Sequence, residues 1–225
     1  MAKKKPDAAS VSRAHQRFNL THDRACSAIA ARNLTLKLLD SSSTKPKKDQ
    51  KEAVDIVMSD ITRSAVMLGV ASMDTYFTAR FAEILVPYIK KHGAKPSLIT
   101  LLSSAGLDTA QAIEMLKMDR PYRRIRTLID AYLDRYTTQR VEVIDNLFIC
   151  YGLKGLCANS QKKANRKNLL RRVELLVQRR HQIVHDGDLN AHDKLCKIDH
   201  EEVLRKLKDV KLFVDSAHSI TENIR

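Results

Sequence analysis

The sequence contains no tryptophan and few of the residues that interrupt helices. Gly occurs 6 times and Pro 5 times in 225 residues, and aromatic residues make up 5% of the chain. An all-β fold depends on many turns rich in Gly and Pro, so this scarcity argues against one. The hydrophobic fraction of 44% still allows an aliphatic core. The composition therefore favours long helices joined by few turns.

Cysteine pairs and long apolar runs are lacking as well. The 4 cysteines include no CxxC pair, and the basic start MAKKKPDAAS is not followed by the apolar stretch of a signal peptide. No run approaches the roughly 18 apolar residues of a membrane span. These absences predict a reduced, cytoplasmic protein that has free thiols and no membrane partner.

Acidic residues are too few to balance the basic ones. Lys and Arg together number 40 against 26 Asp and Glu, which gives a formal charge of +14 and a sequence pI of about 9.7. This charge is well above what solubility alone requires. A cationic surface attracts polyanions, so RNA, DNA or an anionic membrane is the first class of partner to consider.

The pattern of apolar residues predicts one all-α domain. Residues 1–20 are expected to be a basic disordered tail, and residues 21–225 a single domain in which no segment alternates with the period of a β-strand. A helix is predicted from Thr21, residues 41–50 are a linker or exposed loop, and a long helix from about Lys51 is disturbed by Pro87.

The second half of the chain is expected to hold several further helices. Shorter ones are predicted at about 97–104 and 108–118, followed by a helical region that Gly152 and Gly155 close. A basic loop then leads to a helix at about 165–186, for which Gly187 is the C-terminal cap. After a loop, a final amphipathic helix starts with Asp199 as its N-cap.

The helix at about 165–186 carries the most unusual pattern, LLRRVELLVQRRHQIVHDGDLN over residues 169–190. On a helical wheel Arg180 falls near the centre of the apolar stripe, whereas Arg179 is expected to point away from it as ordinary basic surface. A buried guanidinium needs an acidic partner or a charged ligand. On the flank of the stripe stand Glu174, His181 and His185.

Three interpretations of this cluster are alternatives to an Arg180 that binds a charged ligand. HQIVH has the histidine spacing of the HExxH zinc helix, but Gln182 replaces the glutamate that serves as general base, and Arg180 would repel the metal. His185 and Asp186 suit a metal-dependent phosphohydrolase that has further His and Asp ligands nearby, and the residues available for this are His181, Asp188, His192 and Asp193. A purely structural arrangement would pair Arg180 with a core carboxylate, Asp74 or Glu174.

The string RHQIVH, Arg180 to His185, resembles the R-x4-H signature of the HEPN superfamily of all-helical domains. The surroundings agree, since the motif lies late in a long helix, HDGD ends that helix, and an amphipathic helix follows. The segment VASMDTYFTARFAEIL resembles the HEPN helix that carries an acidic residue, here Asp74. The resemblance covers about residues 50–220, with a specific core of some ten residues.

The resemblance implies an all-α, HEPN-like helical bundle with additional helices and the activity of a metal-independent endoribonuclease without a cofactor. In that chemistry Arg180 holds the scissile phosphate, His185 acts as acid or base, His181 shapes the site, and Asp74 orients Arg180 or His185. HEPN nucleases typically form the site where two motifs meet, so a homodimer is expected.

The same resemblance implies a toxin or anti-phage abortive-infection effector, with an antitoxin or other regulatory partner protein. The alternative is a non-catalytic nucleic-acid-binding or scaffold subunit of a defence complex. In either case RNA is the expected partner, and basic residues near the motif are expected to bind its phosphates without reading sequence. These residues are Lys162, Lys163, Arg166, Lys167, Arg171, Arg172, Arg123 and Arg124.

Overall fold

The described part of the chain is all-α, as the sequence predicts. A computed structural model describes residues 11–42 and 47–224, and these residues form nine α-helices and one 3-10 helix without a β-sheet. Residues 1–10 of the predicted tail lie outside the described residues.

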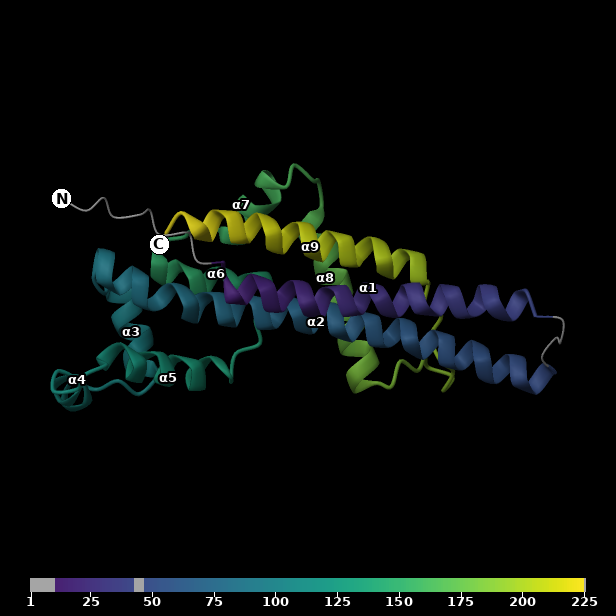
Figure 1. Cartoon of the computed structure of the whole chain (residues 1–225), viewed down its shortest axis with the longest axis horizontal. Coiled ribbons are helices and arrows are strands. Elements are labelled where there is room, and N and C mark those ends of the chain that lie inside the picture. The colour runs from purple at the N-terminus through teal and green to yellow at the C-terminus, as the bar shows by residue number, and fades with distance from the viewer. Residues whose placement is uncertain (1–10, 43–46, 225) are drawn as a thin grey trace, which may run out of the picture.

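Two long helices and the last helix form the body of the molecule. α1 (Arg13–Asp40) and α2 (Lys48–His92) run side by side in opposite directions, and α9 (His200–Glu222) packs along both of them. α8 (Leu169–His185) crosses this layer steeply and packs on α2 and α9 (Figure 1). The two ends of α8 therefore emerge on opposite sides of the molecule.

The shorter helices surround this body. α3 (Pro96–Ser104), α4 (Thr109–Met115) and α5 (Pro121–Leu133) gather at one end of the molecule (Figure 1). α6 (Val141–Phe148), the 3-10 helix η1 (Ile149–Tyr151) and α7 (Leu156–Lys163) then lead back towards α8. The predicted continuous helical region is thus broken between residues 134 and 140, and the predicted basic loop before α8 contains a helix of its own.

The first helix starts earlier than predicted. Ser12 caps α1, because its Oγ accepts a hydrogen bond of 3.2 Å from the amide of His15. Phe18, which the prediction assigned to a disordered tail, is fully buried in the core. Burial of this aromatic ring against α2 explains why a polar, basic segment is helical from Arg13.

The long helix α2 continues through Pro87 to His92, so the predicted disturbance is wrong. Pro87 itself is exposed, while Leu85 and Tyr88 on the inner face are buried. Packing of that inner face holds the helix although proline removes one backbone hydrogen bond. α2 also begins at Lys48, within the predicted linker.

By length and composition α2 could also cross a membrane, contrary to the expectation that no such segment exists. Its most apolar window has a mean hydropathy of 1.3, and half of that window is buried inside the fold. The apolar residues of α2 are those that form the centre of the helical bundle, next to α1, α8 and α9. The core helix of a soluble protein satisfies the same criterion.

A glycine allows a side chain of α9 to pack closely on the middle of α2. A Cβ atom at Gly69 would collide with the side chain of Leu207 on α9 and would reach Leu176 on α8. Gly69 and both leucines are buried. The position that the Leu207 side chain occupies against α2 therefore depends on the absence of a side chain at residue 69.

The loop after α8 is held by a buried carboxylate. Asp188 is 1% exposed, and its Oδ2 accepts hydrogen bonds from Arg63 Nε at 2.6 Å and from Arg179 Nη2 at 2.7 Å. Arg63 Nη2 also donates to the carbonyl of Cys196 at 2.8 Å. These contacts fasten the end of α8 and the following loop to α2.

We predict that Asp188→Asn lowers the free energy of unfolding by about 3–5 kcal/mol, because it leaves two guanidinium groups without their buried anion. Asn tolerates the positive φ of 59° at this position, so the loss reports the charge and not backbone strain. Urea unfolding measures the change. Asp186→Asn, at an exposed neighbouring acid, is the matched control and should change stability by less than about 0.5 kcal/mol. Equal stability of the two variants would contradict this role of Asp188.

Helices α1, α2 and α9 also meet at a cluster of titratable side chains. The rings of His15 and His218 stack with centroids 4.1 Å apart, and the hydroxyl of Tyr76 lies 3.2 Å from His218 Nδ1. His15 Nε2 lies 2.7 Å from Asp215 Oδ1. Burial, with Arg80 and His15 nearby, lowers the pKa of His218 to about 4.

This lowered pKa predicts a loss of stability in mild acid. Between pH 6.5 and pH 4 the unfolded chain binds a proton at His218 that the folded protein does not, so the free energy of unfolding falls across this window, by on the order of 2–3 kcal/mol. Unfolding measured over that pH range gives the slope. In His218→Gln, which does not titrate, the slope should be much smaller, and an unchanged slope would refute the assignment to His218.

Candidate functional site

The apolar stripe of α8 becomes more exposed to solvent towards the C-terminal end of the helix. Leu169, Val173, Leu176 and Val177 are buried, Arg180 and Ile183 are half-buried, and Val184 is 46% exposed. Arg180 thus stands where the stripe leaves the core and reaches solvent. Its position matches the predicted seam, and no residue in the described part of the chain covers the exposed end of that seam.

The two neighbouring arginines differ in their contacts, and the structure corrects the prediction for Arg179. Arg179, expected to be ordinary surface, is bound to the buried Asp188, with Nη1 at 2.6 Å from Oδ1 as well. Arg180 makes no hydrogen bond or ion pair with any described residue. Asp74 and Glu174, the carboxylates proposed as structural partners of Arg180, therefore do not neutralise it.

His181 and His185 lie on one face of the last turn of α8. Their rings stack with centroids 5.4 Å apart and an interplanar angle of 17°. His181 is half-buried and His185 is exposed. The ring of His185 is therefore open to solvent, whereas that of His181 is partly covered. Arg180 directly precedes His181 in the chain.

His181 lies between two adjoining hollows of about 300 Å³ each. The first lies between the start of α6 and the outer face of α8; its lining includes Glu142, Glu174 and Gln178. The second is lined, apart from His181, by one segment of the chain: Arg135, Tyr136, Thr137, Gln139, Arg140 and Val143. Gln139, Arg140 and His181 line both hollows.

The resemblance implies that Asp74 orients Arg180 or His185, but the Asp74 carboxylate hydrogen-bonds to neither of them. It holds the segment that lies opposite His181 instead. Its Oδ1 accepts hydrogen bonds from the amide and from Oγ1 of Thr138, both at 2.7 Å. Its Oδ2 accepts one from Gln139 Nε2 at 2.9 Å. Thr138 and Gln139 are both buried. Asp74 thus influences the site indirectly, because it holds the segment that forms one wall of the second hollow.

This wall was not predicted from the sequence. The stretch DRYTTQR, residues 134–140, was assigned to a continuous helix, although it lacks a run of apolar residues at helical spacing. Tyr136 lies at the surface, 36% exposed, and its hydroxyl is 2.9 Å from that of Tyr132. This hydrogen bond, with partial burial, raises the pKa of Tyr136 to about 12. Its hydroxyl therefore stays protonated at neutral pH.

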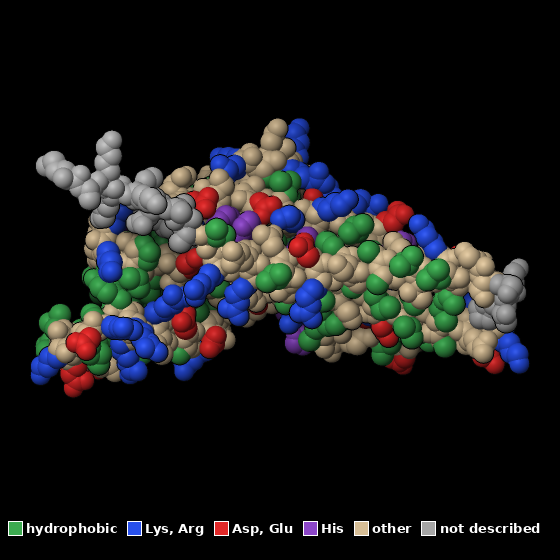
Figure 2. Space-filling view, viewed as in Figure 1, with side chains coloured by type: hydrophobic (Ala, Val, Ile, Leu, Met, Phe, Trp, Pro, Cys, Tyr) green, Lys and Arg blue, Asp and Glu red, His purple; other side chains and the backbone are tan. Residues whose placement is uncertain are grey.

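The basic run that precedes α8 is not beside the motif. α8 has 17 residues and therefore spans about 25 Å, with the basic run at its first turn and the motif at its last. Lys and Arg side chains gather on the upper edge of the molecule, over α7 and α9 (Figure 2). The basic residues that precede α8 are therefore close to the motif in the sequence but distant from it in the structure.

Two members of that run are already bound within the protein. Arg166 Nε and Arg172 Nε each lie 2.7 Å from a carboxylate oxygen of Asp209, which is 1% exposed. The other four predicted phosphate contacts on this run remain exposed at the surface: Lys162, Lys163, Lys167 and Arg171. The available positive charge is therefore smaller than the sequence indicates.

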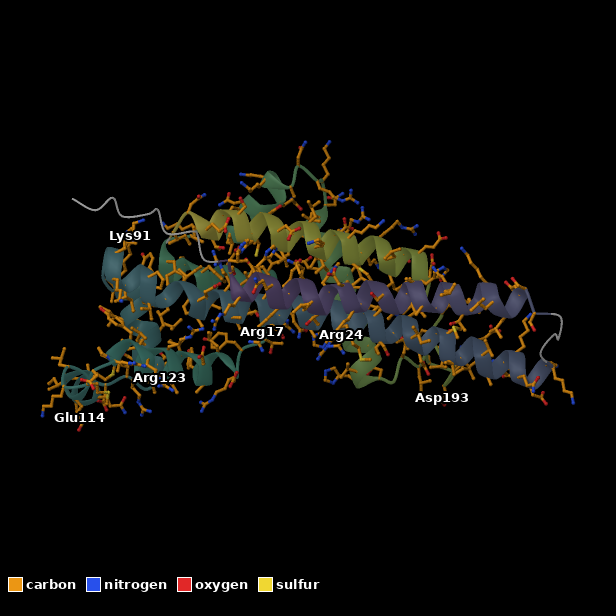
Figure 3. All side chains as sticks on the ribbon, in the orientation of Figure 1. Arg17, Arg24, Lys91, Glu114, Arg123 and Asp193 are labelled. Atoms are coloured by element: carbon orange, nitrogen blue, oxygen red, sulfur yellow. The ribbon has the colours of Figure 1, made fainter. Side chains whose placement is uncertain are left out.

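The second predicted basic patch lies near the far end of the molecule. Arg123 and Arg124 are exposed in the first turn of α5, and Figure 3 places Arg123 well away from Asp193 in the loop that follows α8. It is the opposite end of α5 that leads into the segment lining the hollow. The arginines that line a hollow together with His181 are thus Arg135 and Arg140 and not the predicted pair.

The phosphohydrolase interpretation loses one of its proposed ligands. Asp188 was among the residues available to complete a metal site with His185 and Asp186. Both of its oxygens are occupied by guanidinium groups, and the carboxylate is buried. It is therefore not open to a metal ion in this conformation.

No protein-family model, curated protein or solved structure matches the chain. The resemblance to HEPN domains therefore rests on the residues of the motif and of the Asp74 helix.

We predict that Asp74→Ala frees the segment that lines the second hollow. A hydrogen bond to a charged group contributes about 1.5–3 kcal/mol, so the Thr138 amide should exchange its hydrogen roughly 10- to 150-fold faster. Exchange measured by NMR gives this ratio. The Cys157 amide, bound to Asp145 Oδ1 at 2.8 Å, is the internal control and should keep its rate. Unchanged exchange at Thr138 would show that Asp74 does not hold the segment.

Proposed function

We propose that the protein is a metal-independent endoribonuclease of the HEPN type. The observation that carries this proposal is a cation without an internal partner, Arg180, next to two stacked histidines at the end of one helix. A half-buried guanidinium without a carboxylate is suited to binding an anion from outside the protein. The scissile phosphate of RNA is such an anion.

The chemistry follows from what these side chains do. The ribose 2′-OH attacks the adjacent phosphorus, its proton passes to a base, and the leaving 5′ oxygen receives a proton from an acid. Histidine titrates near neutral pH and performs either transfer, which is the role proposed for the exposed His185. Arg180 binds the phosphate oxygens and stabilises the charge that develops on them. His181 shapes the site between the two hollows.

A homodimer supplies a second copy of the motif. The motif of one chain supplies one Arg180 and one exposed histidine, His185, whereas the reaction needs both an acid and a base. Exposed apolar side chains lie around the end of α8, namely Val184, Leu189 and Leu195, each between 43% and 46% exposed. An isologous contact between two such surfaces would bury them and face the two motifs towards each other.

The cellular role that accompanies this activity is that of a cytoplasmic toxin or abortive-infection effector, controlled by an antitoxin or another regulatory partner. A non-catalytic RNA-binding or scaffold subunit of a defence complex is the alternative. The accessible motif favours the enzyme, since a binding module has little need of both Arg180 and His185.

We predict that the purified protein cleaves single-stranded RNA in EDTA. His185→Ala and Arg180→Ala should each lower the rate at least about 100-fold, because one removes a proton-transfer group and the other a phosphate contact. Gel analysis of an end-labelled RNA measures the rate. Arg205→Ala, at an exposed arginine of α9, is the control and should retain it; circular dichroism should show the same helix content in all variants.

Other results would favour the alternatives. Salt-sensitive RNA binding without cleavage by the wild type supports the scaffold function. Loss of cleavage in EDTA supports a metal-dependent reaction. Sedimentation tests the shared site, and an active enzyme that is strictly monomeric contradicts it.

A further inference from the structure

The hollow formed by residues 135–143 beside His181 has the properties of a ligand site. Its volume of about 300 Å³ is at the lower end of the range for small-molecule pockets. Its lining combines an aromatic ring, two arginines and an amide with the histidine of the motif. Because Asp74 fixes the backbone and side chain of this wall, the hollow is formed before any ligand arrives.

Gln139, which lines this hollow, carries an unused and buried hydrogen-bond acceptor. The side chain is 6% exposed, and its Oε1 has no hydrogen-bond partner among the described residues. Asp74 Oδ2 accepts from Nε2 of the same amide, which determines that the oxygen is the atom left over. A buried acceptor without a partner costs free energy, and a ligand N–H group would satisfy it.

Tyr136 and the two arginines add the other features of a nucleotide site. An exposed tyrosine ring offers a surface on which a base stacks, and arginine binds phosphate. The hydroxyl of Tyr136 lies 2.9 Å from that of Tyr132, and the side chain is 36% exposed. Neither Arg135 nor Arg140 has a carboxylate partner in the described structure, so both guanidinium groups remain open to an anion.

We propose that this hollow binds one unpaired nucleotide of an RNA strand, next to the phosphate that Arg180 holds. The base stacks on Tyr136 and donates a hydrogen bond to Oε1 of Gln139. Arg135 and Arg140 contact the phosphate of the same nucleotide. The inference rests on the proposed endoribonuclease function, and it makes single-stranded RNA the substrate class, because the face of a base is inaccessible within a duplex.

Binding to a cleavage-deficient protein tests the site apart from the chemistry. In a His185→Ala background, fluorescence anisotropy with a labelled single-stranded oligoribonucleotide gives Kd. Tyr136→Ala should raise Kd roughly 5- to 150-fold, since a stacked base contributes about 1–3 kcal/mol. Tyr136→Phe retains the ring and should bind like the parent protein. Tyr122→Ala is the control, because Lys90 covers that ring at 5.0 Å from its centroid.

The arginines and the amide have their own readouts. Arg140→Ala should make the dependence of log Kd on log salt concentration less steep by about 0.7, as expected for one lost contact to a single strand. Gln139→Met should weaken binding as well, because it removes the acceptor while it keeps the size of the side chain.

The outcomes separate the two proposals. Weaker binding in Tyr136→Ala supports the nucleotide site even if the wild type never cleaves RNA. Equal Kd values for Tyr136→Ala and Tyr122→Ala overturn the site even if the wild type is an active nuclease. A duplex RNA that binds as tightly as the single strand also overturns it.

Discussion

The ion pairs of the buried Asp188 determine how the end of α8 is presented. This carboxylate binds Arg63 of α2 and Arg179 of α8, and in this way it fastens the loop after α8 to the core. It engages Arg179, whereas the neighbouring Arg180 has no acidic partner among the described residues at the point where the apolar stripe reaches solvent. Two adjacent arginines of the same helix therefore have different roles: one stabilises the fold, and the other is available to an external anion.

A second carboxylate, Asp74, organises the opposite wall in a comparable way. It binds the backbone and side chain of Thr138 and the amide of Gln139, and so it fixes a segment without helical structure between α5 and α6. The two acidic residues act on different parts of one region, since Asp188 holds the helix end and Asp74 holds the wall of the hollow beside His181. Preorganisation of both parts is what a site for a flexible strand of RNA requires.

The helical periodicity of α2, α8 and α9 predicted these elements and most of their limits, because each buries one long apolar face. The segment 134–140 could not be predicted, since its conformation depends on Asp74, some sixty residues away in the chain. The same reason explains the errors for Arg179, Arg166 and Arg172. A helical wheel shows which side of a helix a guanidinium occupies, but not which distant carboxylate it meets. Arg180 could be singled out from the sequence, because a charged residue within an apolar stripe is visible in the local pattern alone.

The most direct test of this account compares the stability of two single-residue variants. Thermal unfolding of Arg179→Ala and Arg180→Ala can be followed by circular dichroism under identical conditions. The account predicts that Arg179→Ala lowers Tm by roughly 5–10 °C, because it removes one of the two cations that neutralise the buried Asp188. Arg180→Ala should leave Tm within about 2 °C of the wild type, because no internal contact is lost. A large loss of stability in Arg180→Ala, with Arg179→Ala unaffected, would contradict the division of roles between the two arginines.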